Sequence, residues 1–362
     1  MGSVRRATQS FLTGDTRNLH NVAQIPHRIR SWQNVTYKLL ILKHKLDIRW
    51  PTTCYNKRGE MFQNTIAKES STEGVGLHTG VYGHVRLVPA PAETGIVFRR
   101  VDLDNFPIEA QGHNVARVSY ATSLMKQGVL LSTTEHLLAA IYSCGIDNIY
   151  IDIDSIEVPI LDGSAEPFMQ MLEQSGVRKL RRKRRYLKVL KPLEVSEGDR
   201  RIGIYPGDEF RVCCYVDFPH PLVGQQEVEM LVGPDTFRHL LARARTFCFE
   251  RDIDPLKAMG LIRGGSLENA IVLTNDGVMN GPLRFPDEFG RHKALDLIGD
   301  LALAGLPLLA RVEAHKAGHS LHTQLVSRLL ADPSLWTITT GEAARPESEA
   351  YLTALSPVPA AD

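Results

Sequence analysis

The stretch 287–305, DEFGRHKALDLIGDLALAG, predicts a helix of about four to five turns, around which we expect the chain to be organised. The carboxylates of Asp287 and Glu288 suit the positive end of a helix dipole, and Gly305 ends the run. Four apolar side chains recur in it at helical spacing, namely Leu295, Ile298, Leu301 and Leu303.

Three ionisable side chains of this predicted helix, His292, Asp296 and Asp300, follow one another at four-residue intervals. The spacing places an imidazole and two carboxylates in one row beside the apolar stripe. Two carboxylates near a core are costly unless a cation or a histidine neutralises them, and zinc accepts both kinds of ligand. A solvated helix face with an ordinary His–Asp contact explains the same spacing, so the motif alone leaves both interpretations open.

The composition is that of an ordinary soluble protein. The 362 residues suffice for two or three domains, and with 43% hydrophobic residues, 23% charged residues and a net charge of +1 nothing indicates nucleic-acid binding. No apolar run approaches the roughly 18 residues of a membrane span, and no signal peptide is evident. Five cysteines form neither a disulfide framework nor a CxxC pattern, so we expect a reducing compartment.

Residues 1–60 differ from the rest of the chain, with eleven Lys or Arg against three Asp or Glu. Three interpretations compete: a disordered basic extension, a targeting peptide for an organelle, or translated sequence ahead of a true start at Met61. We expect disorder or a misassigned start, and targeting stays open. The last residues, 341–362, are rich in Ala, Pro and Glu and predict a loose tail.

Glycines surround His78 in GVGLHTG, residues 74–80, within a strand-like region that follows Met61. They allow a ligand to approach the backbone closely, although a glycine-rich hairpin explains them equally well. Further on, YIDIDSIEVPILDGSAEPF, residues 150–168, alternates as a strand and leads into a predicted helix over 165–175.

The stretch LLSTTEHLLAAIYSCGIDN, residues 130–148, predicts a helix that Ser132 opens and that ends near Gly145. Ser132 and Glu135 fit the capping box S-x-x-E, which is the structural interpretation of Glu135. The functional interpretation starts from the adjacency of Glu135 and His136, because a histidine can bind a metal while its neighbour acts as general base.

A run of seven basic residues in eight, residues 178–185, separates two stretches that each contain strands followed by helix. It resembles a nuclear localisation signal, but a solvated linker is the commoner explanation, and we expect a linker. This places one α+β domain at 61–180 and a second at 186–340. In the second domain we expect strands near 186–195, 201–206, 210–219 and 308–314. We expect helices over 234–244 and 287–304, and a last helix that follows residues 315–323 and ends at residue 330.

Seven motifs occur in the order GVGLHTG, STTEHLLAA, GIDN, PILDGSAEPF, ARTF, RHKALDLIGDL and KAGH between about residues 61 and 340. Together they resemble the UDP-3-O-acyl-N-acetylglucosamine deacetylases, zinc enzymes of lipid A biosynthesis. The resemblance implies two similar α+β domains, each a sheet with helices on one face, whose helices are sandwiched between the sheets. It also implies Zn²⁺-dependent hydrolysis of the substrate's N-acetyl group, which releases acetate and UDP-3-O-acyl-glucosamine.

The resemblance implies a role for each matching residue. It assigns His136, His292 and Asp296 as zinc ligands, Glu135 as general base, and Thr246 as a stabiliser of the oxyanion. It assigns His319 as general acid or electrostatic stabiliser, oriented by Asp300. The implied substrate-binding residues are Lys293, Lys316, His78, Phe247, Ile253 and Gly264, with an insert at about 250–272 forming a passage for the acyl chain.

The partner expected from the resemblance is a UDP-sugar lipid, with no nucleic acid and no stable membrane insertion; peripheral membrane contact stays open. We expect a monomer in a bacterial cytoplasm. Two alternatives compete with the enzyme: a non-catalytic sugar-nucleotide or lipid-binding protein with a vestigial metal site, and, from the basic segments, a nucleic-acid-binding protein that carries no base-reading motif.

Overall fold

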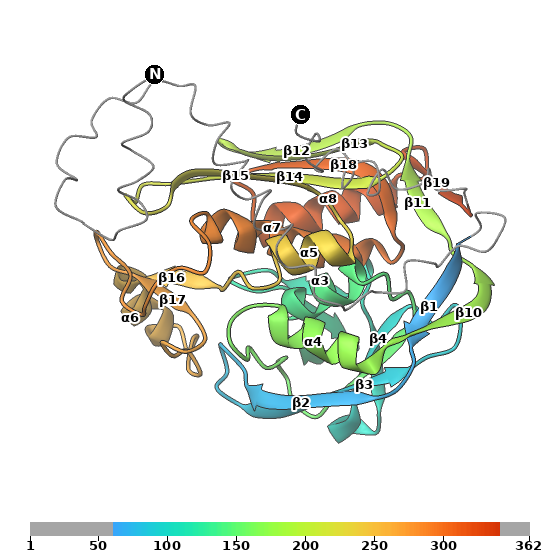
Figure 1. The fold of residues 1–362 in the computed structure, drawn as a ribbon, viewed down its shortest axis with the longest axis horizontal. Coiled ribbons are helices and arrows are strands. Elements are labelled where there is room, and N and C mark those ends of the chain that lie inside the picture. The colour runs from blue at the N-terminus through green and yellow to red at the C-terminus, as the bar shows by residue number, and fades with distance from the viewer. Residues whose placement is uncertain (1–60, 341–362) are drawn as a thin grey trace, which may run out of the picture. The chain divides into compact units, whose positions relative to one another are not determined.

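The computed structural model describes residues 61–340, which form part of a single compact unit (Figure 1). Its helices lie between two larger β-sheets, which confirms the expected α+β class with sandwiched helices. The predicted basic extension 1–60 and the tail 341–362 lie outside the described residues.

The sheet of the first half has the order β2 (Ser70–Val75), β3 (Tyr82–Pro89), β9 (Ile149–Ile153), β4 (Ile96–Arg100) and β5 (Phe106–Glu109). Along β3 the side chains alternate: Val85 and Leu87 are buried, whereas His84 and Arg86 are exposed. Such alternation is typical of a sheet with one face on the core. The helices α3 (Glu135–Ser143) and α4 (Glu166–Ser175) cover the buried face (Figure 1).

The seven-stranded sheet of the second half is built around β18 (Leu308–His315). Strands β13 (Arg200–Pro206), β14 (Phe210–Phe218) and β11 (Tyr186–Val189) pair with it, and β12 (Leu193–Glu197), β15 (Gly224–Leu231) and β19 (Trp336–Thr339) extend these three. Helices α7 (Glu288–Leu301) and α8 (His319–Ala331) pack on this sheet, and α5 (Pro234–Leu240) contacts α3.

Smaller elements complete the framework. A three-stranded sheet contains β6 (Val115–Arg117), β7 (Ser123–Lys126) and β8 (Val129–Leu131), and short 3-10 turns occupy Val101–Leu103, Gly112–Asn114 and Ala302–Ala304. The predicted insert folds as β16 (Phe247–Phe249), α6 (Glu250–Ala258) and β17 (Ile271–Leu273), with β16 and β17 parallel. The sequence did not predict β15, β19 or the helix in the insert.

The basic run is a strand, so the prediction of a solvated linker is wrong. Strand β10 (Val177–Lys183) pairs antiparallel with β1 (Phe62–Ile66), and the Lys179 ammonium lies 4.3 Å from the centroid of the Phe62 ring. Its basic side chains are exposed, as they would be in a solvated linker, so the charge pattern alone could not indicate the strand pairing. The domain boundary placed at this run stays a prediction.

The predicted helix at 287–305 forms as α7, continues as the 3-10 turn Ala302–Ala304, and ends where Gly305 takes a φ of 79°. It crosses α3 at very short range. A Cβ added to Gly299 would lie 2.1 Å from the Glu135 carbonyl oxygen, so any side chain here would collide with the backbone of α3. This contact sets the separation of the two helices.

We expect Gly299→Ala to destabilise the protein by about 1–3 kcal/mol, because overpacking must push α3 and α7 apart. The sign of this stability change is informative, since replacing glycine by alanine within a helix normally stabilises the protein by roughly 1 kcal/mol. Denaturant unfolding measures the change. Gly233→Ala, at the N-cap of α5, is a control for an added methyl group that meets nothing closer than 3.8 Å. An unchanged or raised midpoint for Gly299→Ala would contradict the assigned contact.

Candidate functional site

The acid–imidazole row of α7 is buried. His292, Asp296 and Asp300 are 1%, 2% and 0% exposed, respectively. The solvated-face interpretation is therefore excluded, and each carboxylate needs a partner inside the protein because burying an unpaired charge is very costly.

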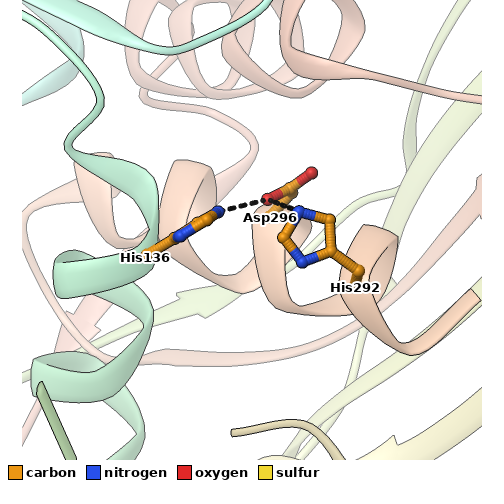
Figure 2. Close-up of side chains that lie close together, drawn as sticks. All are labelled: His136, His292 and Asp296. Atoms are coloured by element: carbon orange, nitrogen blue, oxygen red, sulfur yellow. Dashed lines mark ion pairs between the residues drawn. The ribbon is translucent and has the colours of Figure 1, made fainter. Parts of the chain in front are cut away.

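His136 of α3 completes a cluster with His292 and Asp296 (Figure 2). The Nε2 atoms of both histidines lie 3.5 Å from the same oxygen, Asp296 Oδ1, which accepts no hydrogen bond from the described residues. His292 donates its Nδ1 hydrogen to the Ala244 carbonyl at 3.1 Å, which leaves the lone pair of Nε2 directed at the cluster. Two imidazole nitrogens and one carboxylate oxygen fit a zinc ion with an open position.

The protonation of these groups also fits cation binding. Burial lowers the pKa of His292 to about 3, so its imidazole is neutral. Burial alone would raise the pKa of Asp296, but the neighbouring Lys293 ammonium helps to outweigh it, and this pKa lies well below its usual range. The Lys293 ammonium donates to Asp296 Oδ2 at 2.9 Å, leaving the other oxygen for the cluster.

Glu135 is the first residue of α3 and is 3% exposed. The predicted capping box is absent: no side chain caps α3, and the Ser132 hydroxyl accepts a hydrogen bond from Ser123 instead. The Glu135 carboxylate turns inward and accepts the backbone N–H of Thr122 at 3.1 Å. Burial raises the pKa of Glu135, which strengthens it as a base. The capping interpretation is wrong because Glu135 faces the core.

His319, the first residue of α8, donates from Nδ1 to Asp300 Oδ2 at 2.7 Å. Its Nε2 lies 4.0 Å from Glu135 Oε1 and 3.9 Å from Asp296 Oδ2, so the ring faces the cluster. Burial alone would lower the pKa of His319, but Asp300 outweighs it and raises this pKa to about 9. The imidazole therefore holds a proton at neutral pH.

Asp300 has two further partners that the sequence analysis missed. His322 donates from Nδ1 to Asp300 Oδ2 at 2.8 Å, and the Thr122 hydroxyl donates to Oδ1 at 2.5 Å. The i, i+3 spacing of His322 from His319 on one helix was a usable signal. No sequence signal pointed to Thr122, because its segment carries no recognisable motif.

A buried ion pair fixes the ARTF segment beside the cluster. Glu288 is fully buried and accepts the backbone N–H of Arg245 at 3.0 Å and its Nε at 2.9 Å. Arg245 follows Ala244, whose carbonyl orients His292, and precedes Thr246, whose N–H donates to the Gly163 carbonyl at 2.8 Å. The pair was not predicted, since Glu288 was assigned to the helix dipole.

An apolar cavity of about 530 Å³ opens beside the cluster. Five of the predicted site residues line it: His78, Thr246, Phe247, Ile253 and Lys293. Gly264 does not; a Cβ there would lie 2.3 Å from the Gly76 carbonyl oxygen, so it permits two loops to meet. Lys316 is not among the lining residues either, and its ammonium contacts Asp199 and Asp217 at 3.1 Å each.

The loop that carries His78 is held by Glu157, which is fully buried. This carboxylate accepts the backbone N–H groups of His78 at 2.9 Å and Thr79 at 2.7 Å, and the Thr133 hydroxyl at 2.8 Å. The loop in turn accepts, through its His78 carbonyl, the N–H of Arg263 in the insert at 3.1 Å. The rim of the cavity thus joins both halves of the chain.

Comparison with known proteins gives a consistent family. A family model described as "LpxC: UDP-3-O-acyl N-acetylglycosamine deacetylase" matches residues 63–331. The chain is 53% identical over 280 residues to a UDP-3-O-acyl-N-acetylglucosamine deacetylase of Solibacter usitatus, covering 77% of this chain and 95% of the relative. A protein of the same name from Anaeromyxobacter dehalogenans is 45% identical over 297 residues, covering 81% and 96%. Within residues 61–340 no helix has the length and apolar character needed to cross a membrane.

We expect Arg245→Met to lower the free energy of unfolding by about 3–5 kcal/mol, because it leaves the Glu288 carboxylate buried without its cation. Denaturant unfolding measures the loss. The double variant Arg245→Met/Glu288→Gln removes the uncompensated charge and should recover part of it. Equal stability of Arg245→Met and the native protein would show that the pair does not hold this segment.

Proposed function

Because the chain belongs to the family of UDP-3-O-acyl-N-acetylglucosamine deacetylases, we propose that the buried cluster on α3, α7 and α8 is its active site. The protein is a hydrolase that removes the N-acetyl group of UDP-3-O-acyl-N-acetylglucosamine in lipid A biosynthesis, giving acetate and the free amine. One observation carries the placement: two histidine nitrogens converge at 3.5 Å on the same carboxylate oxygen, which has no hydrogen-bond donor among residues 61–340.

In this proposal His136, His292 and Asp296 hold a zinc ion. When bound, the ion polarises the acetyl carbonyl and lowers the pKa of a water molecule to about 7. The protein keeps the three ligands ready, because His292 is neutral and fixed by the Ala244 carbonyl. Lys293 holds the second oxygen of Asp296 and keeps the carboxylate oriented.

Glu135 and His319 divide the proton transfers in the proposed mechanism. Glu135 takes a proton from the water that attacks the acetyl carbon, and Thr246 stabilises the carbonyl oxygen as negative charge develops on it. The C–N bond then breaks, and His319 gives its Nε2 proton to the departing sugar nitrogen. General acid–base catalysis of this kind is typically worth about 10²–10⁴ in rate, and one oxyanion donor about 2.7–4 kcal/mol.

We further propose that the cavity beside the cluster takes the fatty acyl chain. Its lining is mostly apolar, with Phe247 and Ile253 on its wall and Lys293 at the side of the cluster. Lys316 would bind the diphosphate by exchanging its contacts with Asp199 and Asp217 for phosphate oxygens. Gly264 contributes by allowing the loop around His78 to close against the insert.

The remaining proposals concern the surroundings of the enzyme. We propose that the protein acts in a bacterial cytoplasm, supported by the bacterial relatives and by a nucleotide-linked substrate. We also propose that it is a monomer. Peripheral membrane contact would suit the acylated substrate. A targeting role of residues 1–60 falls outside the described residues. A non-catalytic binding protein is disfavoured, because the proposed base, acid and ligand residues converge in one buried cluster.

We expect acetate release from UDP-3-O-acyl-N-acetylglucosamine to stop on chelation and to return when zinc is added. His292→Ala should lose stoichiometric zinc, because a ligand is removed. Glu135→Gln should keep zinc and lower kcat by about 10²–10⁴, because only the base is lost. Acetate assays combined with metal analysis of the purified variants separate the two effects.

Lys191→Ala is the control, since this residue is exposed and does not line the cavity. It should retain zinc and native kcat. Full zinc content in His292→Ala would contradict the role of His292 as a zinc ligand. Near-native turnover in Glu135→Gln would contradict the role of Glu135 as the general base. Turnover by the native protein that a chelator does not affect would remove zinc from the mechanism.

The raised pKa of His319 predicts a pH effect. A general acid must be protonated, so activity should fall as pH rises through the pKa of His319, which lies at about 9 in the structure. Asp300→Asn removes the anion that stabilises the imidazolium, so the pKa falls and the alkaline limb of the kcat–pH profile should move to lower pH. An alkaline limb at the same pH in both proteins would assign this limb to another group.

A further inference from the structure

Thr122 contacts both arms of the proposed proton-transfer machinery. It is fully buried in the segment that precedes β7. Its backbone N–H donates to Glu135 Oε2 at 3.1 Å, and its hydroxyl donates to Asp300 Oδ1 at 2.5 Å. The same hydroxyl oxygen lies 3.2 Å from His319 Nδ1. One residue of the first half therefore contacts the base on α3, the carboxylate on α7 and the acid on α8.

We propose that Thr122 is a positioning residue that fixes the general acid relative to the general base during deacetylation. The two hydrogen bonds use different groups: the backbone holds Glu135, and the side chain holds Asp300 and through it His319. This inference rests on the proposed function and extends it to a residue that does not touch the substrate in the proposed mechanism.

The hydroxyl is needed because the rest of Asp300 is already committed. Asp300 Oδ2 accepts both imidazoles, from His319 at 2.7 Å and from His322 at 2.8 Å. Without the Thr122 hydroxyl, Oδ1 would lose the short hydrogen bond that fixes the plane of a fully buried carboxylate. An unsatisfied charged group costs more than an ordinary hydrogen bond, so the carboxylate would turn toward other donors. His319 would then turn with it.

His319 depends on this carboxylate because it lies at the very start of α8, after Gly318. Its Nε2 lies 4.0 Å from Glu135 Oε1, which is close enough for acid and base to contact the same reacting group. Reacting groups must be held closely in place, and small displacements are expensive in rate. The carboxylate that the Thr122 hydroxyl fixes therefore sets where the proton is delivered.

The hydroxyl is not what anchors the segment. The Thr122 carbonyl accepts the backbone N–H of Thr134 at 3.3 Å and its hydroxyl at 3.2 Å, and the Thr122 N–H remains bonded to Glu135. These three backbone contacts survive any side-chain substitution other than proline. Removing the hydroxyl alone therefore separates positioning of the acid from folding of the segment.

The test compares Thr122→Val, which has the same shape without the hydroxyl, with Thr122→Ser, which keeps the hydroxyl. We expect Thr122→Val to lower kcat about 10–100-fold, the range typical when a partner that orients a reacting group is lost. KM should stay within about twofold and zinc content close to native, whereas the thermal midpoint should fall, because the buried Asp300 carboxylate loses a donor. Thr122→Ser should restore kcat to within about threefold of native, a rescue that a packing role would not give.

A double variant shows whether the effect passes through His319. In a His319→Gln background the acid is absent, so adding Thr122→Val should cause little further loss of kcat. Equal losses in both backgrounds, or native kcat in Thr122→Val, would overturn the inference. Thr122→Ala, which cannot overpack the site, replaces Thr122→Val if the latter does not fold. Absence of acetate release by the native protein would overturn the proposed function instead, independently of any Thr122 variant.

Discussion

The close crossing of α3 and α7 is the constraint on which the rest of the structure depends. Gly299 lets the second helix run against the backbone of Glu135, and this approach brings His136 within 3.5 Å of Asp296. The geometry of a cluster whose side chains come from two helices depends on the separation of those helices. The sheets on either side hold the helices together by burying their apolar faces. The packing of the core therefore affects the cluster mainly through the contact between Gly299 and Glu135.

Charge balance explains why so many acids coexist in this core. Glu135, Asp296 and Asp300 are all nearly or fully buried, and each has its own compensation: a backbone N–H, the Lys293 ammonium, or two imidazoles and a hydroxyl. The compensation is uneven. Both oxygens of Asp300 accept hydrogen bonds, whereas one oxygen of Asp296 has no hydrogen-bond donor among residues 61–340. The divalent cation of the proposed function would complete the balance at this oxygen.

Sequence reasoning identified side chains that the structure brings together where helical periodicity decides which of them share a face. The row on α7 and the neighbours Glu135 and His136 could be identified because helical spacing fixes which side chains share a face. It failed where partners come from distant segments. Thr122 lies 178 positions from Asp300, and the strand pairing of the basic run depends on residues more than one hundred positions earlier. The capping-box prediction was wrong because the Glu135 carboxylate bonds the distant Thr122 N–H instead of a backbone N–H at the start of its own helix.

Across the rim of the cavity, the loop around His78 and the insert meet through backbone contacts. The N–H groups of Arg263 and Gly264 bond the carbonyls of His78 and Leu77, and Gly264 permits this approach. Contacts of this kind are largely indifferent to which side chains the neighbouring positions carry. If the cavity takes the acyl chain as proposed, its lining can diversify toward acyl chains of different length or branching while the helices of the proposed active site stay unchanged. Substrate range and catalytic power could then evolve on separate parts of one chain.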